Sequence, residues 1–347
     1  MNTFLEIPSY LLHGTIKDES RYRHFSPFSV IAIGNNSLRL SLSLSMVLNP
    51  GQQINIKILG MVLVAEVQRW NENLQWLEID VEFIKRLRWE LSHILIQHTE
   101  FTPLELTGIG LSCRKLKSYL DYSLIRTDEE YQQVLKLRRQ TYSQANKMEA
   151  DRPLEKLKYF FDEYSDVLIV RHGNKIIGSA AIIYGDGKDK MFEVQKLMLN
   201  NSDKLEYNDS MIEVAALCIL KEYRKTDILH GVFENIFFYM MKNKKDYIIA
   251  SSDSKLAKTY KMIGFKDTGD YFLQPKYNDL AMQVLIVNKN AALKAHGIGF
   301  LHWWPIWGEI VTYMKSQSMV KMGLYNRAKL FVREVAYKTM KFFIASS

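Results

Sequence analysis

Glu213 and Tyr260 are the two side chains of this sequence best placed to exchange protons. Glu213 stands near the start of the apolar run 212–220, which is short and bounded like a buried strand. A carboxylate there could act as a general base, or it could end the strand in solvent. Tyr260 lies in a predicted helix, where it could donate a proton or pack beside the Gly-Phe turn that follows it.

A basic turn between these two residues could bind an anion. Residues 221–227 are mostly charged, and apolar residues then recur at three-to-four spacing from Leu229 to Met240, which predicts an amphipathic helix. A turn that leads into a helix presents unpaired N–H groups and the positive end of the helix dipole to a phosphate. A second strand at 247–250 and a helix that stops at Gly264 complete the stretch.

This order of elements resembles the acyl-CoA-binding half of the GNAT acyltransferase superfamily. The matching segments are the central strand 213–220, the pyrophosphate turn 224–229 and the Tyr-x-x-x-Gly-Phe ending at 260–265. The resemblance implies a mechanism in which an amine attacks a thioester, Glu213 removes a proton directly or through water, and Tyr260 protonates the departing thiolate. It also implies a donor site formed by Leu217, Cys218, Ile219, Arg224, Lys225, Ile228 and Leu229.

The carbonyl of the thioester needs a hydrogen-bond donor as its charge grows. A backbone N–H near Leu217 or Ile219 could serve if the strand bulges there. Asp227 and Leu229 stand where the superfamily's turn has glycines, so a side chain obstructs the phosphates and a carboxylate repels them. The expected co-substrate is an acyl-CoA or an acyl carrier protein, whose phosphopantetheine arm carries a single phosphate, and no permanently bound cofactor is expected.

The segment that precedes these elements narrows the resemblance. Residues 137–142 and 161–166 resemble the acyl-homoserine-lactone synthases and the N-acyl amino acid synthases, which implies that Arg139, Tyr142 and Asp162 shape the side of the site that binds the amine acceptor. Arg139 and Asp162 could instead pair with each other or face solvent. Lactone synthases carry arginines where this chain has alanines, at positions 180 or 181 and 216, which favours the N-acyl amino acid branch or a relative without activity.

The first hundred residues indicate a small β module. Leucines alternate with polar residues over 38–44 and isoleucines over 54–58, and a helix with one apolar face follows at 84–95. This order resembles a PilZ domain, with Arg21-Tyr22-Arg23 and Ser37-Leu38-Arg39-Leu40 in the places of its motifs. Because these motifs lack cationic and glycine positions of the family, we expect a degenerate barrel that does not bind cyclic di-GMP and serves as a docking or dimerisation surface.

Composition limits the classes of protein and partner. The chain has 347 residues, enough for two domains, and a net charge of +8, which suits an acidic carrier protein or an anionic membrane but is also explained by solubility. No nucleic-acid partner is expected. Cys113 and Cys218 have no metal-ligand spacing, and His172 and His230 have no ligand-spaced companions, so no metal site is predicted. No signal peptide or apolar membrane span is evident, and the cysteines suit a reducing compartment, which predicts a cytoplasmic protein, peripheral on the inner membrane if its tail binds there; the family resemblance implies a bacterial one.

The C-terminal tail combines tryptophans with a basic amphipathic helix. Residues 298–311, which contain Trp303, Trp304 and Trp307, resemble the C-terminal segment of the N-acyl amino acid branch. The helix that follows has an apolar stripe between basic residues, a pattern typical both of a helix on a membrane surface and of one packed on its own domain. Both possibilities remain open at this point.

Together these patterns predict an α+β protein. It would contain a PilZ-like β-barrel over residues 1–105, a linker over 106–122, a GNAT-fold mixed sheet flanked by helices over 123–290, and a helical tail over 291–347. The predicted function is transfer of a fatty acyl group from an acyl carrier protein or acyl-CoA to the amino group of an amino acid or similar amine. The alternatives are an acetyl-CoA-dependent N-acetyltransferase and a non-catalytic GNAT-fold binding module coupled to the barrel.

Overall fold

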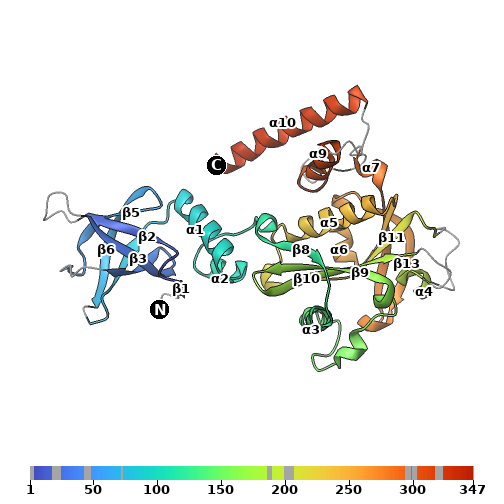
Figure 1. The fold of residues 1–347 in the computed structure, drawn as a ribbon, viewed down its shortest axis with the longest axis horizontal. Coiled ribbons are helices and arrows are strands. Elements are labelled where there is room, and N and C mark those ends of the chain that lie inside the picture. Colours follow the sequence, from blue (N-terminus) through green and yellow to red (C-terminus); the bar gives the residue numbers. More distant parts are fainter. Residues whose placement is uncertain are drawn as a thin grey trace. The chain divides into compact units, whose positions relative to one another are not determined.

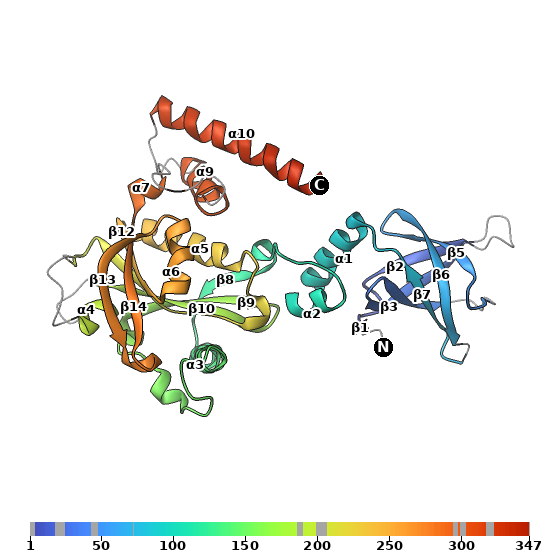
Figure 2. The same ribbon diagram turned by 180° about the vertical axis from the view of Figure 1, so that it is seen from behind.

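The structure is a computed structural model that describes residues 4–17, 25–42, 48–71, 73–185, 190–198, 207–293, 298, 303–316 and 323–346 (Figure 1). The chain forms two compact units. The first consists of Met1–Tyr119 with Glu222–Thr226, and the second of Leu120–Lys221 with Asp227–Ser347. Figure 2 shows the same elements from behind.

The first unit contains the predicted β-barrel. Its strands follow the order β1-β3-β2-β5-β6-β7-β4, and β3 also pairs with β4, which closes the sheet on itself. The strands are β1 (Leu5–Glu6), β2 (His13–Lys17), β3 (Phe25–Gly34), β4 (Ser37–Leu42), β5 (Gln53–Ile58), β6 (Met61–Asn71) and β7 (Trp76–Val81). The helices of this unit are α1 (Lys85–His98), α2 (Pro103–Gly108) and the short η1 (Lys117–Tyr119).

The period-two pattern explains why these strands enclose a core. Along β6, Leu63 and Val67 are buried whereas Val62 and Val64 are exposed, because successive side chains of a strand point to opposite faces. Helix α1 adds leucines at positions 87, 91 and 95, which are fully buried. Arg88 fastens α1 to its surroundings, since its guanidinium and Nε donate to Asn36 Oδ1 at 2.7 Å, to the Gly110 carbonyl at 2.6 Å and to the Phe83 carbonyl at 2.7 Å.

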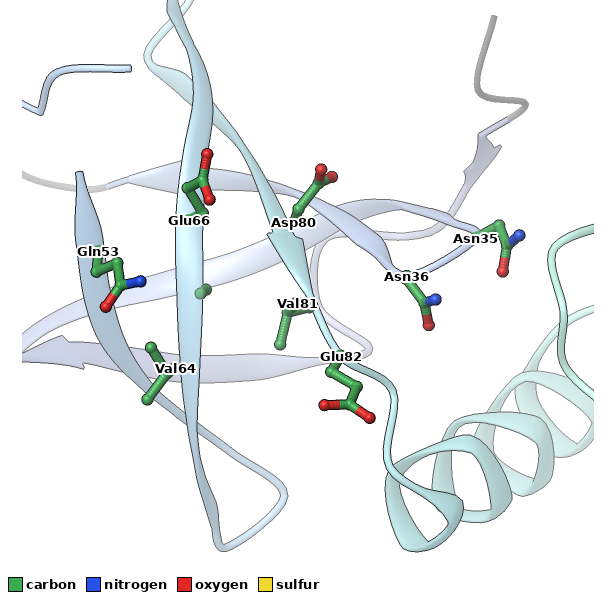
Figure 3. Close-up of a pocket in the computed structure, with 9 residues that line it drawn as sticks. Asn35, Asn36, Gln53, Val64, Glu66, Asp80, Val81 and Glu82 are labelled. Carbon is green, nitrogen blue, oxygen red and sulfur yellow. The ribbon is translucent and has the colours of Figure 1, made fainter. Parts of the chain in front are cut away.

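The surface of the barrel carries a hollow of about 310 Å³ with an acidic lining. Figure 3 shows the carboxylates of Glu66, Asp80 and Glu82 around it. Burial raises the pKa of Asp80, and the nearby charges of Glu78 and Glu66 raise it further. Such a surface repels phosphate rather than binding it.

The two motifs that resemble those of PilZ domains contain Arg21, Arg23 and Arg39. Arg21 and Arg23 lie outside the described residues. The guanidinium of Arg39 lies 4.7 Å from the ring centres of both Phe4 and Trp76, and it pairs with Glu78 at 3.3 Å. Arg39 is therefore held by contacts within its own unit.

The second unit is a mixed seven-stranded sheet with helices on both faces, as predicted. The strand order is β13-β14-β12-β11-β10-β9-β8, and only β11 and β12 run parallel. The strands are β8 (Asp121–Leu124), β9 (Ser165–His172), β10 (Lys175–Tyr184), β11 (Met211–Ile219), β12 (Tyr247–Ser252), β13 (Lys266–Gln274) and β14 (Leu280–Asn288). Figures 1 and 2 show α3 on one face of the sheet and α5 and α6 on the other.

The helices of this unit range from single turns to long rods. They are α3 (Asp128–Gln144), η2 (Leu154–Leu157), η3 (Asp162–Tyr164), α4 (Glu193–Leu197), η4 (Lys221–Tyr223, of which only Lys221 belongs to this unit), α5 (Ile228–Lys242), α6 (Ser254–Met262), η5 (Pro275–Tyr277), α7 (Lys289–Leu293), η6 (Trp304–Gly308), α9 (Glu309–Ser316) and α10 (Leu324–Ser346). None of the helices in the described ranges is long and apolar enough to cross a membrane.

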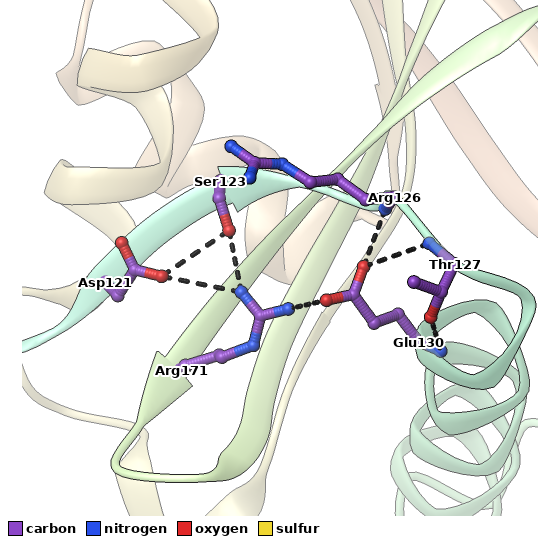
Figure 4. Close-up of polar contacts among 6 residues, drawn as sticks. All are labelled: Asp121, Ser123, Arg126, Thr127, Glu130 and Arg171. Atoms are coloured by element: carbon purple, nitrogen blue, oxygen red, sulfur yellow. Dashed lines mark hydrogen bonds and ion pairs between the residues drawn. The ribbon is translucent and has the colours of Figure 1, made fainter.

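A polar network fixes the start of α3 against the edge of the sheet. Thr127 and Glu130 form a capping box, in which Thr127 Oγ1 accepts from the Glu130 N–H at 3.2 Å. Arg171 of β9 pairs with Glu130 and donates to Ser123 Oγ of β8 at 2.7 Å (Figure 4). Strands β8 and β9 thereby determine where α3 begins.

The first part of the tail packs against its own unit. Trp303 and Trp307 are fully buried, and their indole N–H groups donate to the Ala292 carbonyl at 2.7 Å and the Ile263 carbonyl at 3.0 Å. Trp307 also meets the edge of Phe237 on α5. Trp303, Trp304 and Trp307 would suit a membrane interface by their type, but Trp303 and Trp307 are core residues of their own unit.

The alternation along β6 gives a stability prediction. Val67→Ala should lower the free energy of unfolding of the barrel unit by about 1–3 kcal/mol, because it leaves a cavity in the core. Val62→Ala on the same strand is the matched control and should change it by less than about 0.5 kcal/mol, since Val62 is exposed. Urea unfolding of the whole chain followed by circular dichroism measures both. Equal effects of the two substitutions would contradict the assigned faces of β6.

Candidate functional site

The central strand β11 separates from its neighbour in the middle of the sheet. It pairs with β12 only from Met211 to Val214. On its other side the register shifts between Ala181↔Ala215 and Ser179↔Cys218, so that two residues of β11 lie opposite one residue of β10. This is a β-bulge, and Ala216 within it has a φ of 51°, a conformation that non-glycine residues rarely adopt.

The bulge leaves backbone groups available at the predicted place. Ala216 and Leu217 have no Cα partner in either neighbouring strand, among the strands that the structure describes. A backbone N–H at this point can be aimed at a bound carbonyl oxygen instead of at a neighbouring strand. The sequence placed this donor near Leu217 or Ile219 on the condition of a bulge, and the bulge is present.

A cavity of about 60 Å³ opens beside the bulge. Its lining comes from both separated strands, from α3, α4 and α6, and from the end of β13 with the residues after it. It consists of Tyr142, Lys147, Glu193, Val214, Ala215, Ala216, Leu217, Ser251, Ser252, Asp253, Leu256, Tyr260, Gln274, Tyr277 and Met282. Three of the predicted site residues, Tyr142, Leu217 and Tyr260, therefore meet at one place.

Two carboxylates are buried near this cavity, and only one of them lines it. Glu213 is fully buried, and its Oε2 accepts from the Glu193 N–H at 2.6 Å, whereas its Oε1 finds no hydrogen-bond partner among the residues that the structure describes. Glu193, the first residue of α4, lines the cavity, and its Oε1 accepts from Gln274 Nε2 at 3.0 Å. Glu213 thus contacts the backbone of Glu193 and does not line the cavity itself.

Burial controls the protonation of this pair. It raises the pKa of Glu193 to about 7, while the Gln274 hydrogen bond and the charges of Lys276 and Arg138 act in the opposite direction. The pKa of Glu213 lies well above its ordinary value because of burial and the neighbouring charge of Glu193. Two buried carboxyl groups close to each other do not readily ionise together, because the charge of one disfavours the charge of the other.

Tyr260 is positioned by aromatic packing. Its ring makes edge contacts with Phe233 at 5.3 Å and packs near Phe265 at 5.4 Å between ring centres. Burial raises its pKa above the ordinary value of a tyrosine, so the hydroxyl remains protonated at neutral pH. A neutral phenol of this kind can donate a proton or a hydrogen bond to a departing thiolate.

On the predicted acceptor side, the partner of Asp162 is Arg138 and not Arg139. Arg138 is almost fully buried and makes two bonds to Asp162, at 2.7 and 3.0 Å, and Tyr131 donates to the same carboxylate at 2.6 Å. Arg139 is partly exposed and does not bond Asp162. The alternative in which Arg139 pairs with Asp162 is therefore not the arrangement observed.

Asp162 also lines a second hollow of about 450 Å³ beside the start of α3. Arg126, Lys158 and Glu163 lie at the same hollow, so it presents charges of both signs. Tyr142 does not line it and belongs to the cavity at the bulge. The predicted acceptor residues are thus distributed between two places in the second unit.

The other predicted donor residues lie on the segments that follow Leu217 in the chain. Cys218 and Ile219 continue β11, and Ile228 begins α5, with Leu229 next to it. The exposed Arg224 and Lys225 belong to the first unit. Asp227 is the N-cap residue of α5 but makes no capping hydrogen bond through its side chain.

Sequence reasoning missed Glu193, Gln274 and Arg138. Arg138 had a usable signal, because it falls four residues after Val134 and four before Tyr142, both of which face the core. Glu193 stands between Phe192 and Val194, an acid inside an apolar run, which is a weak signal for a buried carboxylate. No group of three or more His, Cys, Asp or Glu side chains that could hold a metal ion occurs in the described part of the chain.

Comparison with known proteins places these features in context. No curated protein matches the sequence significantly. Among solved structures, the N-acyl amino acid synthase FeeM from uncultured soil microbes is 15% identical, with 49% of this chain and 89% of that chain covered and a TM-score of 0.38. The acyl-homoserine-lactone synthase LasI is 11% identical, with coverages of 49% and 89% and a TM-score of 0.38.

A third structure is the CoA-dependent acyl-homoserine lactone synthase BjaI with SAM and isopentyl-CoA. It is 12% identical, with 59% of this chain and 92% of that chain covered and a TM-score of 0.41. Solved structures with identities and TM-scores this low do not indicate the function of this chain, whereas a match to a family model does. Residues 133–287 match the family model described as N-acyl amino acid synthase FeeM, and this likeness supports an N-acyltransferase.

Proposed function

We propose that the second unit transfers a fatty acyl group from a thioester to the amino group of an amino acid or a similar amine. The observation that carries this proposal is the cavity at the bulge, where a buried carboxylate, a neutral phenol and the bulged strand backbone converge within the region similar to the N-acyl amino acid synthases. These are the three groups that aminolysis of a thioester requires.

The reaction balances with groups of this chain. The amine nitrogen attacks the thioester carbon, so a C–N bond forms and the C–S bond breaks. A buried carboxylate at the cavity takes the proton that leaves the nitrogen, and Glu193 lines that cavity with Glu213 behind it. Tyr260 gives its proton to the thiolate, and the backbone N–H near Leu217 stabilises the charge on the carbonyl oxygen.

For the acyl donor, we propose an acyl carrier protein in preference to free acyl-CoA. Asp227 at the N-cap of α5 places a negative charge where a pyrophosphate would bind. Leu229 adds a side chain at the second position where the superfamily has a small residue. A phosphopantetheine arm has one phosphate and meets less of this repulsion. The net charge of +8 also favours an acidic carrier protein.

For the amine acceptor, we propose that Asp162 and Tyr142 shape its binding, with Arg139 available for a carboxylate. Asp162 is held rigidly by Arg138 and Tyr131 and still lines the hollow beside α3. Arg139 is partly exposed, and a guanidinium with free donors can bind the carboxylate of an amino acid in a forked geometry.

For the barrel, we propose a degenerate PilZ-like domain that acts as a docking surface without binding cyclic di-GMP. Arg39 is an arginine of the PilZ-like motif, and it is engaged in contacts with Phe4, Trp76 and Glu78. The acidic hollow around Asp80 is unsuited to phosphates. Calorimetric titration of the whole chain with the dinucleotide tests this point, and a binding heat at one site would refute it.

The first prediction concerns activity in cells. Bacteria that express the whole chain should accumulate new N-acyl amino acids, detected by mass spectrometry of lipid extracts against cells with an empty vector. Tyr260→Phe should reduce them by about 10- to 100-fold, since the ring packing stays and the proton donor is lost. Tyr271→Phe, at an exposed tyrosine, is the matched control and should have no effect. Soluble, folded protein without any new lipid would instead favour a non-catalytic binding module.

The second prediction concerns membranes. Leu324, Phe331 and Val332 of α10 are exposed, which leaves an apolar face beside basic residues such as Arg327. We expect the chain to sediment with anionic phospholipid vesicles and Phe331→Asp to weaken this several-fold. Val62→Asp, at an exposed valine of the barrel, is the control for the added charge. Unchanged sedimentation of the Phe331→Asp protein would exclude α10 as the contact.

The third prediction is the pH dependence of stability. The folded chain holds the Glu213 proton to a higher pH than the unfolded chain, because burial and Glu193 raise its pKa. Stability is therefore lost as the pH rises above the ordinary pKa of a glutamate, and Glu213→Gln removes this loss. The difference in unfolding free energy between Glu213→Gln and the parent should grow in favour of the variant from about pH 5 to about pH 8.

Urea unfolding at a series of pH values measures this difference. Glu149→Gln, at an exposed glutamate, is the control and should show no such trend. An offset for Glu213→Gln that stays constant over the whole range would show that the Glu213 carboxyl does not titrate differently in the two states.

A further inference from the structure

We infer that Glu193 is the catalytic residue that receives the proton from the attacking amine, and that Glu213 and Gln274 position it. The inference rests on the proposed function and assigns one step of it to a residue that the sequence did not single out. Its basis is the position of Glu193 at the cavity, the bonds of its carboxylate and the charges around it.

The two buried carboxylates differ in whether they line the cavity. Glu193 lines the cavity together with Leu217 and Tyr260, whereas Glu213 does not. A general base must lie within hydrogen-bond reach of the proton that it removes. Glu193 meets this requirement for an amine bound in the cavity, and Glu213 does not.

The hydrogen bonds of the two residues also differ in kind. Glu213 Oε2 accepts from the backbone N–H of Glu193, so its carboxylate holds the first residue of α4 in place. In contrast, Glu193 uses Oε1 for Gln274, and within the described residues its Oε2 makes no hydrogen bond. An oxygen of the cavity-lining carboxylate therefore remains available for a proton from the substrate.

The charges around Glu193 come from four elements. Glu213 of β11 and Asp162 of η3 are acids, whereas Arg138 of α3 and Lys276 of η5 are bases. Their opposing effects, together with burial, leave the pKa of Glu193 at about 7, while that of Glu213 lies well above its ordinary value. Near neutral pH, Glu193 is thus the member of the pair that can alternate between its two forms, whereas burial and the charge of Glu193 hold the proton on Glu213 more firmly.

The test measures acyl transfer by the whole chain as a function of pH. The donors are dodecanoyl carrier protein and dodecanoyl-CoA, and the acceptor is a mixture of the protein amino acids. The parent should show a rise of kcat/KM with pH and an inflection near pH 7, because the base must be deprotonated. Glu193→Gln should lower kcat by about 10²- to 10⁴-fold and remove the inflection.

Substitutions of the positioning residues Gln274 and Glu213 should change the pH profile of kcat/KM in a different way. Gln274→Leu removes a hydrogen bond that favours ionised Glu193, so the inflection should move to higher pH. Glu213→Gln should lower kcat but keep an inflection, since Glu193 is still present. Glu149→Gln is the control with parental kinetics, and the melting temperature of each variant shows that it is folded.

The outcomes distinguish a wrong assignment of Glu193 from a wrong proposed function. A parent that transfers acyl groups, with a Glu193→Gln variant of the same kcat and inflection, overturns the assignment of Glu193 and leaves the proposed function intact. Loss of the inflection in Glu213→Gln together with its retention in Glu193→Gln assigns the base to Glu213 instead. A folded parent without transfer from either donor overturns the proposed function and this inference with it.

Discussion

The burial of two carboxylates in one apolar core is the constraint on which the second unit depends. Glu213 is fully buried and Glu193 is 6% exposed. An ionised carboxylate in such surroundings is costly unless hydrogen bonds and counter-charges compensate for lost water. The N–H of Glu193 and the amide of Gln274 supply those bonds, so α4, β11 and the end of β13 must keep their mutual spacing. The core that surrounds them, with Phe192 and Val194 on either side of Glu193, maintains it.

The bulge in β11 explains why this costly arrangement faces a cavity at all. Up to Val214 the strand is paired with β12, and beyond it the two strands separate, so their backbones line the space between them. At the point of separation Ala216 adopts a left-handed conformation, which costs a non-glycine residue roughly 1–2 kcal/mol. Local strain of this kind persists where the surrounding structure enforces it, and here the paired segments on both sides of Ala216 do so.

Local patterns were enough to predict the architecture but not the contacts of the site. Alternation over 38–44 and 54–58 gave the barrel strands, and the order from Glu213 to Phe265 gave the second sheet, because both depend on periodicity within a few residues. Glu193 and Gln274 meet across 81 positions, a distance at which sequence spacing carries no information. Choosing between Arg138 and Arg139 required only the helical period, since Arg138 shares a face with Val134 and Tyr142.

The same burial that raises the pKa of a carboxylate also raises that of a phenol, and this gives the cavity its two opposite protonation states. Glu193 loses its proton near pH 7, whereas Tyr260 keeps its proton beyond the ordinary range of a tyrosine. Between these limits a base without its proton and an acid with its proton are present together, as aminolysis of a thioester requires. A solvent-exposed glutamate would be ionised as well, but it would be a weaker base, because its pKa would lie further below neutrality. The apolar wall of the cavity therefore sets the basicity of Glu193, whereas Tyr260 would carry its proton at neutral pH even without burial.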